Sequence, residues 1–455
     1  MGDNTGLRHV FVDSNNVING QKYYYAVVSY DHGDAELMVA PVECSKTITV
    51  NPETGEVLLD VNTVAVVPRT MTAGYVASTF TDSLPDQIQG NGTGLINLEI
   101  IDHTAIQDQN DYKIIFSEDD GLNYSVLDEK EVSDTLIARL GNYHKLSHQN
   151  IDSLTFELHN SNGTLLTKGS DYDLLDTDGQ ILIHNDGSIN ESEQIVATFI
   201  YYPIKNSKKL ALEEGNPIFD GMTLSIQNEV LELDEEKIGW NQDSPNNWVP
   251  TVKPFNNLGN NKYPADYELR WFNEKVSNNY RPGYEYVQAN FEIWETTRGF
   301  EPRQLPFIVI ETAPFDSIWN PGERIIILQD SSMSSFSWEL TFDTTDVPIA
   351  PMEGDVFSIF TTRAFVDDIF AFSTSSSKED IIVEKDNMDD IYVVPNPYVV
   401  SSNIEPLDLQ NPLDRGPRRV YFANLPSNCT IDIYTMSGEL VQSLKHNSSI
   451  EDGIK

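Results

Sequence analysis

The chain has 455 residues, of which 39% are hydrophobic and 10% aromatic, so it can build apolar cores and is not a disordered polymer. Its 71 acidic residues against 29 Lys and Arg give a net charge of −42, which argues against binding to nucleic acid or anionic lipid. Two cysteines, Cys44 and Cys429, are too few for a disulfide framework or a multi-cysteine zinc site, and no apolar run is long enough for a transmembrane helix.

Short alternating runs rich in Val, Ile, Tyr, Phe and Thr predict β-strands along the whole chain, separated by Gly, Asn, Asp and Pro turns. The clearest are 22–30, 95–101, 111–116, 180–185, 195–202, 222–228, 267–272, 324–329, 336–342 and 356–362. Helical periodicity is scarce, and only 127–147 and 206–214 have room for a turn or two of helix. Strands at this spacing predict an all-β fold of several antiparallel β-sandwich modules.

Shifts in composition predict where the modules begin and end. Residues 373–390 are Ser-rich and then acidic, which is typical of a tether between domains. The predicted segments are a partial N-terminal sandwich (1–49), a linker (50–92), a β-sandwich domain (93–205), a second β-rich domain or a continuation of the first (206–375), a linker (376–390) and a C-terminal module (391–455).

The N-terminal segment 19–33 carries a turn glycine, Gly20, followed by Tyr23, Tyr25 and Val27 on one face at period two. This pattern resembles the last part of a fibronectin type III domain, in which a tyrosine hydroxyl caps a nearby loop. The resemblance assigns that role to Tyr23. A complete sandwich of this kind needs about 100 residues, so we expect either a remnant whose earlier strands lie before Met1, or strands that pair elsewhere in the chain. The first alternative also accounts for a polar N-terminus without a secretion signal.

Two C-terminal segments, 391–402 and 418–444, give the most specific pattern. They resemble the Ig-like C-terminal module of proteins exported by the type IX secretion route, and also the Ig-like domain of the flagellar hook-capping protein. The matching residues are Pro395, Asn396, Pro397, Asn424, Leu425, Pro426, Cys429, Thr430, Tyr434, Gly438 and Val441. Family members continue beyond the position of Lys455, so the resemblance implies a truncated copy, with the secretion machinery as a partner of the full-length protein.

The middle of the chain, residues 93–375, loosely resembles domains that accompany such sorting modules in large secreted bacterial proteins. The matching stretches are 92–116, 215–229, 265–272, 287–297, 319–327 and 354–372. This resemblance carries no catalytic residue over to the chain.

One acidic loop is a candidate calcium site. Asp171, Asp173, Asp176 and Asp178 offer hard oxygen ligands beside Gly179, but their spacing does not fit an EF-hand. The alternative is a β-turn at 177–179 on a solvated acidic surface. No other cofactor is predicted.

Trp240 and Trp248 flank an Asn-rich loop and could form an aromatic platform for a sugar ring. The other tryptophans that fall within strand patterns, Trp271, Trp294 and Trp338, are expected in the core. His144 and His148 are four residues apart and could share a helix face, but no His-Glu-x-x-His zinc pattern is present.

No catalytic motif stands out, because the chain lacks Gly-x-Ser-x-Gly and its many carboxylates give no basis for choosing a catalytic pair. We therefore expect a non-enzymatic, secreted or cell-surface structural or adhesive β-sandwich protein, with surface glycans or neighbouring surface proteins as partners. The alternative is a carbohydrate-binding accessory region of a larger secreted hydrolase. A third hypothesis, a hydrolase in 93–375, would be favoured by a cleft with two carboxylates of raised pKa.

Overall fold

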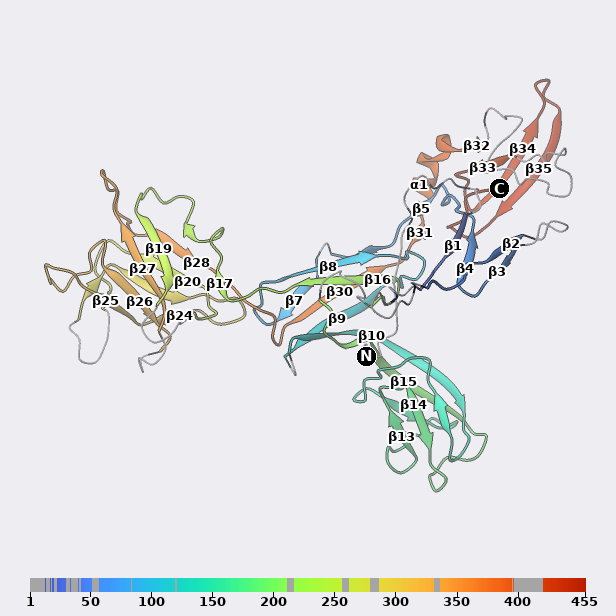
Figure 1. Ribbon diagram of the computed structural model, residues 1–455, viewed down its shortest axis with the longest axis horizontal. Helices are drawn as coiled ribbons and strands as arrows, with labels where there is room; N and C mark the ends of the chain where they lie inside the picture. Colours follow the sequence, from blue (N-terminus) through green and yellow to red (C-terminus); the bar gives the residue numbers. More distant parts are fainter. Residues whose placement is uncertain are drawn as a thin grey trace. The chain divides into compact units, whose positions relative to one another are not determined.

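The computed structural model describes residues 13, 17, 19, 23–29, 33, 40, 42–50, 57–82, 84–118, 121–210, 217–255, 262–278, 286–330, 336–394, 396 and 420–455. Antiparallel sheets dominate these residues, and their helical structure is limited to α1 (Ile381–Asp386) and one 3-10 turn, η1 (Met388–Asp390) (Figure 1). The predicted all-β class is confirmed. The chain divides into two compact units, one built mainly from residues 80–102 and 109–374, and the other from 9–79, 103–108 and 375–455.

The largest sheet of the first unit has seven strands in the order β12–β15–β10–β9–β30–β6, with β7 also pairing with β30. Its strands are β6 (Thr79–Phe80), β7 (Asp86–Gln89), β9 (Asn110–Ser117), β10 (Asn123–Ile137), β12 (Glu157–His159), β15 (Gln194–Ser207) and β30 (Ile369–Ser375). Strand β10 alternates half-buried and exposed residues from Glu131 onward, with Val132 and Leu136 turned to an apolar core. The turn or two of helix for which 127–147 had room does not form in β10, because the period of this strand is two.

A smaller three-stranded sheet, β11–β14–β13, covers one part of the seven-stranded sheet. It comprises β11 (Tyr143–Lys145), β13 (Tyr172–Leu175) and β14 (Gln180–Ile183). Residues from both sheets share one core, including Tyr172, Ile183, Ile195 and Phe199. The turn predicted at 177–179 joins β13 to β14.

A second sandwich in the first unit packs a five-stranded sheet against a four-stranded one. The first has the order β18–β28–β20–β23–β24 and the second β19–β27–β26–β25. Their strands are β18 (Gly239–Trp240), β19 (Val249–Pro254), β20 (Tyr267–Trp271), β23 (Phe291–Glu295), β24 (Arg303–Leu305), β25 (Phe307–Ile310), β26 (Arg324–Leu328), β27 (Phe336–Asp343) and β28 (Val356–Ile359). Aromatic rings fill the core between them, with Trp271 touching Phe291, Trp319 and Phe342.

Three short pairs complete the first unit. They are β8 (Leu95–Ile100) with β16 (Met222–Gln227), β17 (Glu232–Leu233) with β29 (Thr361–Thr362), and β21 (Ser277–Asn278) with β22 (Gln288–Ala289). A third set of rings, including stacked Phe116 and Phe365, packs beside β9 and β30.

The described strands of the second unit form two-stranded pairs. They are β1 (Tyr23–Ala26) with β4 (Thr63–Val66), β2 (Ile48–Val50) with β3 (Val57–Leu59), β5 (Tyr75–Val76) with β31 (Lys378–Glu379), β32 (Tyr392–Val394) with β33 (Tyr421–Ala423), and β34 (Asn428–Tyr434) with β35 (Leu440–Asn447). The expected linkers 50–92 and 376–390 thus carry secondary structure, including α1, whose N-cap Asp380 accepts a hydrogen bond from the Ile382 amide.

The two family-like segments lie in this second unit. Tyr23 and Tyr25 are half-buried on the same face of β1, and the Tyr25 hydroxyl donates to Asp13 at 2.9 Å, whereas Val27 is 80% exposed. In the C-terminal segment, Ile431 and Ile433 share the half-buried face of β34. Gly20, Pro395 and Pro397 lie outside the described residues.

Candidate functional site

Two clefts of the first unit are lined by polar and charged side chains. The first, the Arg363 cleft, has a volume of about 430 Å³ and lies beside the 84–96 segment, with Lys237, Arg298 and Arg363 in its wall. The second, the Asp220 cleft, has about 410 Å³ and is formed by residues 145–150, 201–203 and 218–220. Both volumes fall in the range of roughly 300–1,000 Å³ that is usual for small-ligand sites.

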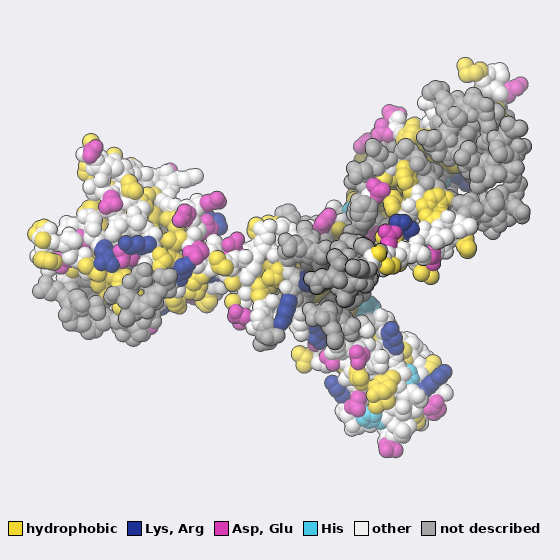
Figure 2. Space-filling view, viewed as in Figure 1, with side chains coloured by type: hydrophobic (Ala, Val, Ile, Leu, Met, Phe, Trp, Pro, Cys, Tyr) yellow, Lys and Arg dark blue, Asp and Glu magenta, His cyan; other side chains and the backbone are white. Residues whose placement is uncertain are grey.

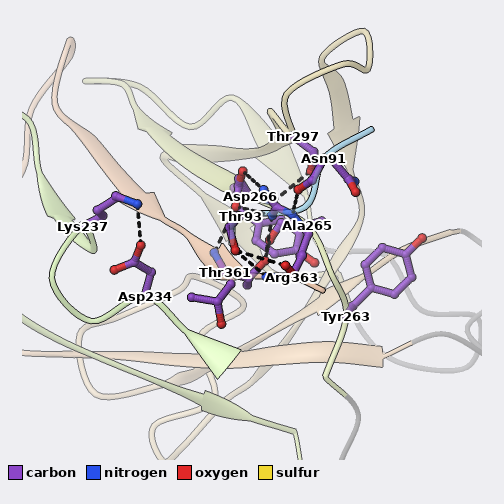
Figure 3. A network of polar contacts seen from close by, with 12 residues as sticks. Asn91, Thr93, Asp234, Lys237, Tyr263, Ala265, Asp266, Thr297, Thr361 and Arg363 are labelled. Carbon is purple, nitrogen blue, oxygen red and sulfur yellow. Dashed lines mark hydrogen bonds and ion pairs between the residues drawn. The ribbon is translucent and has the colours of Figure 1, made fainter. Parts of the chain in front are cut away.

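Arg363 is the centre of a buried polar network (Figure 3). Only 5% of the residue is exposed, yet its guanidinium donates to both carboxylate oxygens of Asp266, at 2.7 and 3.0 Å. It also donates to the Thr361 hydroxyl and to the carbonyl of Asn91. This two-pronged pairing satisfies a charge that would be very costly to bury alone.

The same network links three segments that are distant in sequence. The Arg363 amide donates to the Thr93 hydroxyl at 2.7 Å, and the Thr93 amide donates back to the Arg363 carbonyl. The Asp266 carboxylate accepts from the Thr361 amide, while the Asp266 amide donates to the Thr297 hydroxyl. The network therefore ties the chain before β8 to the ends of β20, β23 and β28.

The other two cationic side chains of the Arg363 cleft, Lys237 and Arg298, form fewer contacts within the protein. Lys237 pairs with Asp234 at 2.7 Å on the surface. Arg298 donates to the side chain and carbonyl of Gln87 at 3.3 Å each, and it forms no ion pair with any carboxylate of the described residues. Because Arg363 has its donors engaged within the protein, this cleft is foremost a structural junction.

The Asp220 cleft depends on a tight turn for its shape. Asp220 and Gly221 have φ values of +45° and +78°, and the flanking Phe219 and Met222 exchange both backbone hydrogen bonds. These features define a type I′ turn, for which Asp-Gly is a preferred sequence. The turn places the Asp220 side chain in the cleft wall.

Another part of the wall is the loop 145–150, which is held by the β13–β14 turn. The Leu146 amide donates to the Gly179 carbonyl at 2.8 Å, and the Asn150 amide donates to the Thr177 carbonyl. A Cβ atom at Gly179 would lie 1.9 Å from the His148 carbonyl oxygen, so only glycine permits this approach. The sequence pattern Thr-Asp-Gly at 177–179 thus fixes where His148 and Asn150 lie.

The Asp220 carboxylate in the cleft wall and the buried Asp128 carboxylate belong to one hydrogen-bonded network. The Tyr112 hydroxyl donates to Asp220 at 3.1 Å. Asp128 is 1% exposed, accepts from the Asn110 side chain at 3.1 Å, and is hydrogen-bonded to the Tyr201 hydroxyl.

Burial raises the pKa values of these groups. Desolvation, together with the nearby charge of Asp128, raises the pKa of Asp220, while the Tyr112 hydroxyl partly offsets the shift. Desolvation also raises the pKa of Asp128, against the opposing hydrogen bonds from the Lys130 amide and Asn110. The pKa values of both tyrosines rise for the same reason. Burial therefore favours the neutral form of each of these groups.

Polar and aromatic side chains complete the cleft wall. The His148 ring lies 4.0 Å from the Tyr201 ring and its Nδ1 is hydrogen-bonded to Ser147 at 2.8 Å. Asn150, in the left-handed region at φ +53°, donates from its side chain to the Tyr202 carbonyl. The cleft therefore offers carboxylate, amide, imidazole and hydroxyl groups beside two phenol rings.

The four predicted calcium ligands have different partners. The buried Asp171 carboxylate accepts from the Thr167 amide and from the amide and hydroxyl of Ser188, at 2.7–2.8 Å. Those hydrogen bonds lower the pKa of Asp171. Asp173 bonds His184 at 2.9 Å, Asp176 pairs with Lys205 at 3.6 Å, and Asp178 is exposed. Among the described residues, no group of three or more His, Cys, Asp or Glu is placed to hold a metal ion.

Both tryptophans of the predicted sugar platform pack against the aromatic core of the second sandwich. Trp240 contacts Trp271, Phe342 and Phe357, and its indole NH donates to the Trp248 carbonyl. Trp248 contacts Trp271 and Trp319, and its own NH is buried without a hydrogen-bond partner. The structure thus brings the two together, as part of the packing around Trp271.

The residues of the two clefts were not apparent from sequence. Asp128 and Asp220 are two of 71 acidic residues and lie far apart in the chain. The Asp220-Gly221 pair signals a turn, but nothing local indicates which strand it faces. His144 lies on β11, not on a helix, and its ring nitrogens contact the carbonyls of Asn142 and Ile137.

Comparison with protein-family models, curated proteins and solved structures finds no match to this chain. In the part of the chain that the structure describes, no helix is long and apolar enough to cross a membrane.

Proposed function

We propose that this chain is part of an extracellular or cell-surface structural and adhesive protein that is exported by a type IX-like route and has no catalytic role in this region. The export route is supported by the pattern from Pro395 to Val441. The acidic surface is compatible with an exposed, soluble location, and acidic side chains are scattered over the face shown in Figure 2.

The observation that carries the structural role is the buried Arg363–Asp266 pair with its partners. A single guanidinium holds segments near residues 91, 266 and 361 together. Buried, fully hydrogen-bonded charges fix one geometry and tolerate little alternative packing. A junction of this kind is compatible with a structural role, in which the sheets stay assembled.

The alternative, a carbohydrate-binding accessory region, is favoured by a different observation. The Asp220 cleft combines two tyrosine rings with carboxylate, amide and imidazole groups. The same pair of carboxylates with raised pKa also favours the hydrolase hypothesis, so the test must separate binding from cleavage.

The test uses the whole chain on immobilised polysaccharides and on intact bacterial cells. Retention on either surface, without release of new reducing ends in the same incubation, supports an adhesive, non-catalytic function. Reducing ends that increase with time would overturn the non-catalytic assignment. Export is tested separately in the source bacterium, where loss of a core type IX component should abolish surface exposure of the full-length protein.

A further inference from the structure

We infer that the Asp220 cleft is a binding site for a neutral saccharide, with Asp220 and Asn150 hydrogen-bonding its hydroxyl groups and Tyr202 packing on a ring face. The inference rests on the proposed adhesive function and deepens it by naming the site and the ligand class. It uses a cleft that is separate from the tryptophans singled out in the sequence.

The first support is the set of hydrogen-bonding groups that remain unused. One oxygen of the Asp220 carboxylate accepts from Tyr112, and no described residue donates to the other. His148 bonds Ser147 through Nδ1, and its Nε2 has no partner among the described residues. Saccharide hydroxyls both donate and accept, so they match a wall that presents carboxylate and imidazole groups together.

The second support is how firmly these groups are held. Asp220 lies in a two-residue turn closed by paired backbone hydrogen bonds, and Asn150 is fixed by the Tyr202 amide, which donates to its carbonyl at 2.9 Å. Both have positive φ, at +45° and +53°. Side chains positioned before the ligand arrives lose less conformational entropy on binding.

The charged side chains around the cleft favour a neutral ligand. The Asp220 carboxylate in the wall disfavours an anionic ligand, while Lys145 in the wall and Lys205, 5.4 Å from the Tyr202 ring, disfavour a cationic one. The described residues offer no group of three metal ligands here, which argues against a bound cation. A neutral polyol with an apolar ring face fits both the polar wall and the phenol rings.

The key variant is Asp220→Asn in the full chain. Asparagine has the same shape and tolerates positive φ, so the turn should remain intact while the carboxylate is lost. Asp186→Asn, an exposed aspartate elsewhere in the first unit, makes the same charge change and serves as the matched control. Tyr202→Ala, with the exposed Tyr143→Ala as its control, tests the ring contact.

Binding is measured by titration calorimetry with cello-, xylo-, manno- and N-acetylchito-oligosaccharides, and with oligogalacturonate as the anionic comparison. We expect one neutral series to bind, Asp220→Asn and Tyr202→Ala to weaken it at least tenfold, and both controls to match the native chain. Equal binding by Asp220→Asn and the native chain would overturn the inference and leave the adhesive function standing. Retention on cells or polysaccharides without binding to any neutral oligosaccharide would also overturn the inference and leave the adhesive function standing. If the chain is retained neither on cells nor on polysaccharides, the proposed function is overturned as well. Preferential binding of oligogalacturonate would overturn the neutral class.

Discussion

The carboxylate of Asp266 and the guanidinium of Arg363 face each other through two hydrogen bonds of 2.7 and 3.0 Å, although 96 residues of chain separate them. Both residues are less than 10% exposed. Neither buried charge would be stable in the protein interior without the other.

Replacing Asp266 with Asn should leave Arg363 charged and unpaired in the interior. We expect a loss of about 3–5 kcal/mol in the free energy of unfolding of the first unit, since this is the usual cost of removing one partner of a buried pair. Urea denaturation followed by tryptophan fluorescence measures it, because this unit contains Trp271 and Trp338.

The control for this change is Glu268→Gln, which removes the carboxylate that pairs with Arg270 at 2.7 Å in a more exposed position. Surface pairs contribute only about 0–1 kcal/mol, so this variant should be almost as stable as the native chain. Equal losses in the two variants would mean that the Arg363 pair is not buried in solution.

Asp171 is the second residue whose role can be tested by substitution. Its carboxylate accepts hydrogen bonds from Thr167 and Ser188, so Asp171→Ala should leave buried donors unpaired and cost about 1–3 kcal/mol. Thermal melting is measured with calcium and with a chelator at fixed ionic strength. A loss of the same size in both conditions supports the anchoring role, whereas a loss seen only with calcium would make Asp171 a metal ligand.

Sequence reasoning found the strands because local patterns determine them. The Thr-Asp-Gly turn at 177–179 and the alternation at 195–202 are properties of neighbouring residues, and both match the structure. The pairing of Arg363 with Asp266 is different, because it depends on which distant segments meet. With 71 acidic residues available, an arginine in the sequence gives no indication of its partner.

The surroundings of the candidate site residues were unpredictable for the same reason, because they depend on contacts between distant segments. Trp240 and Trp248 are separated by a polar loop, which suggested exposure, but their rings lie on the core of the five- and four-stranded sheets. Asp128 and Asp220 are linked through the side chains of Tyr112, Asn110 and Tyr201. Strand register, and not spacing in the sequence, determines where these three side chains lie.

Asp220 in the cleft wall and the buried Asp128 predict an unusual dependence of stability on pH. Their pKa values are raised on folding, so the folded chain binds more protons than the unfolded chain between the unfolded pKa near 4 and the raised folded value. Their contribution to stability is therefore greatest below that interval and is lost as pH rises through it. The groups facing Asp220 are Asp128, Tyr112 and His148.

Asp220→Asn should reduce this decline, because an amide does not titrate. The free energy of unfolding is measured from pH 4 to pH 8, and the native chain should lose stability relative to the variant as pH rises. The Asp186→Asn control should keep the native slope. A difference between Asp220→Asn and native that does not vary with pH would show that Asp220 titrates normally.

Trp240→Ala and Trp248→Ala separate packing from ligand binding. Both rings pack against Trp271, so each truncation should cost about 3–5 kcal/mol as a large-to-small core substitution. Chemical denaturation gives the loss, and saccharide titration below the transition gives the affinity. A weakened affinity with unchanged stability would instead establish an exposed sugar platform.

Gly453 of the second unit lies where the C-terminal segment meets residues 70–72. The Gly453 amide donates to the Thr70 carbonyl at 2.7 Å, and its carbonyl accepts from the Leu425 amide at 3.0 Å. A Cβ atom at this position would lie 2.2 Å from the Met71 carbonyl oxygen, and backbone atoms on that side have no rotamer by which to give way.

Gly453→Ala should therefore push the C-terminal segment away from residues 70–73 and cost about 1–3 kcal/mol, as an overpacked site does. Hydrogen exchange provides a local readout: amides at Thr72, Ala73 and Leu425 donate to this junction and should exchange faster in the variant. Gly239→Ala is the control, because no atom lies within 4 Å of its added methyl group. If Gly453→Ala keeps native exchange rates at all three amides, the close approach to Met71 does not exist in solution, and the junction between these segments must be held in another way.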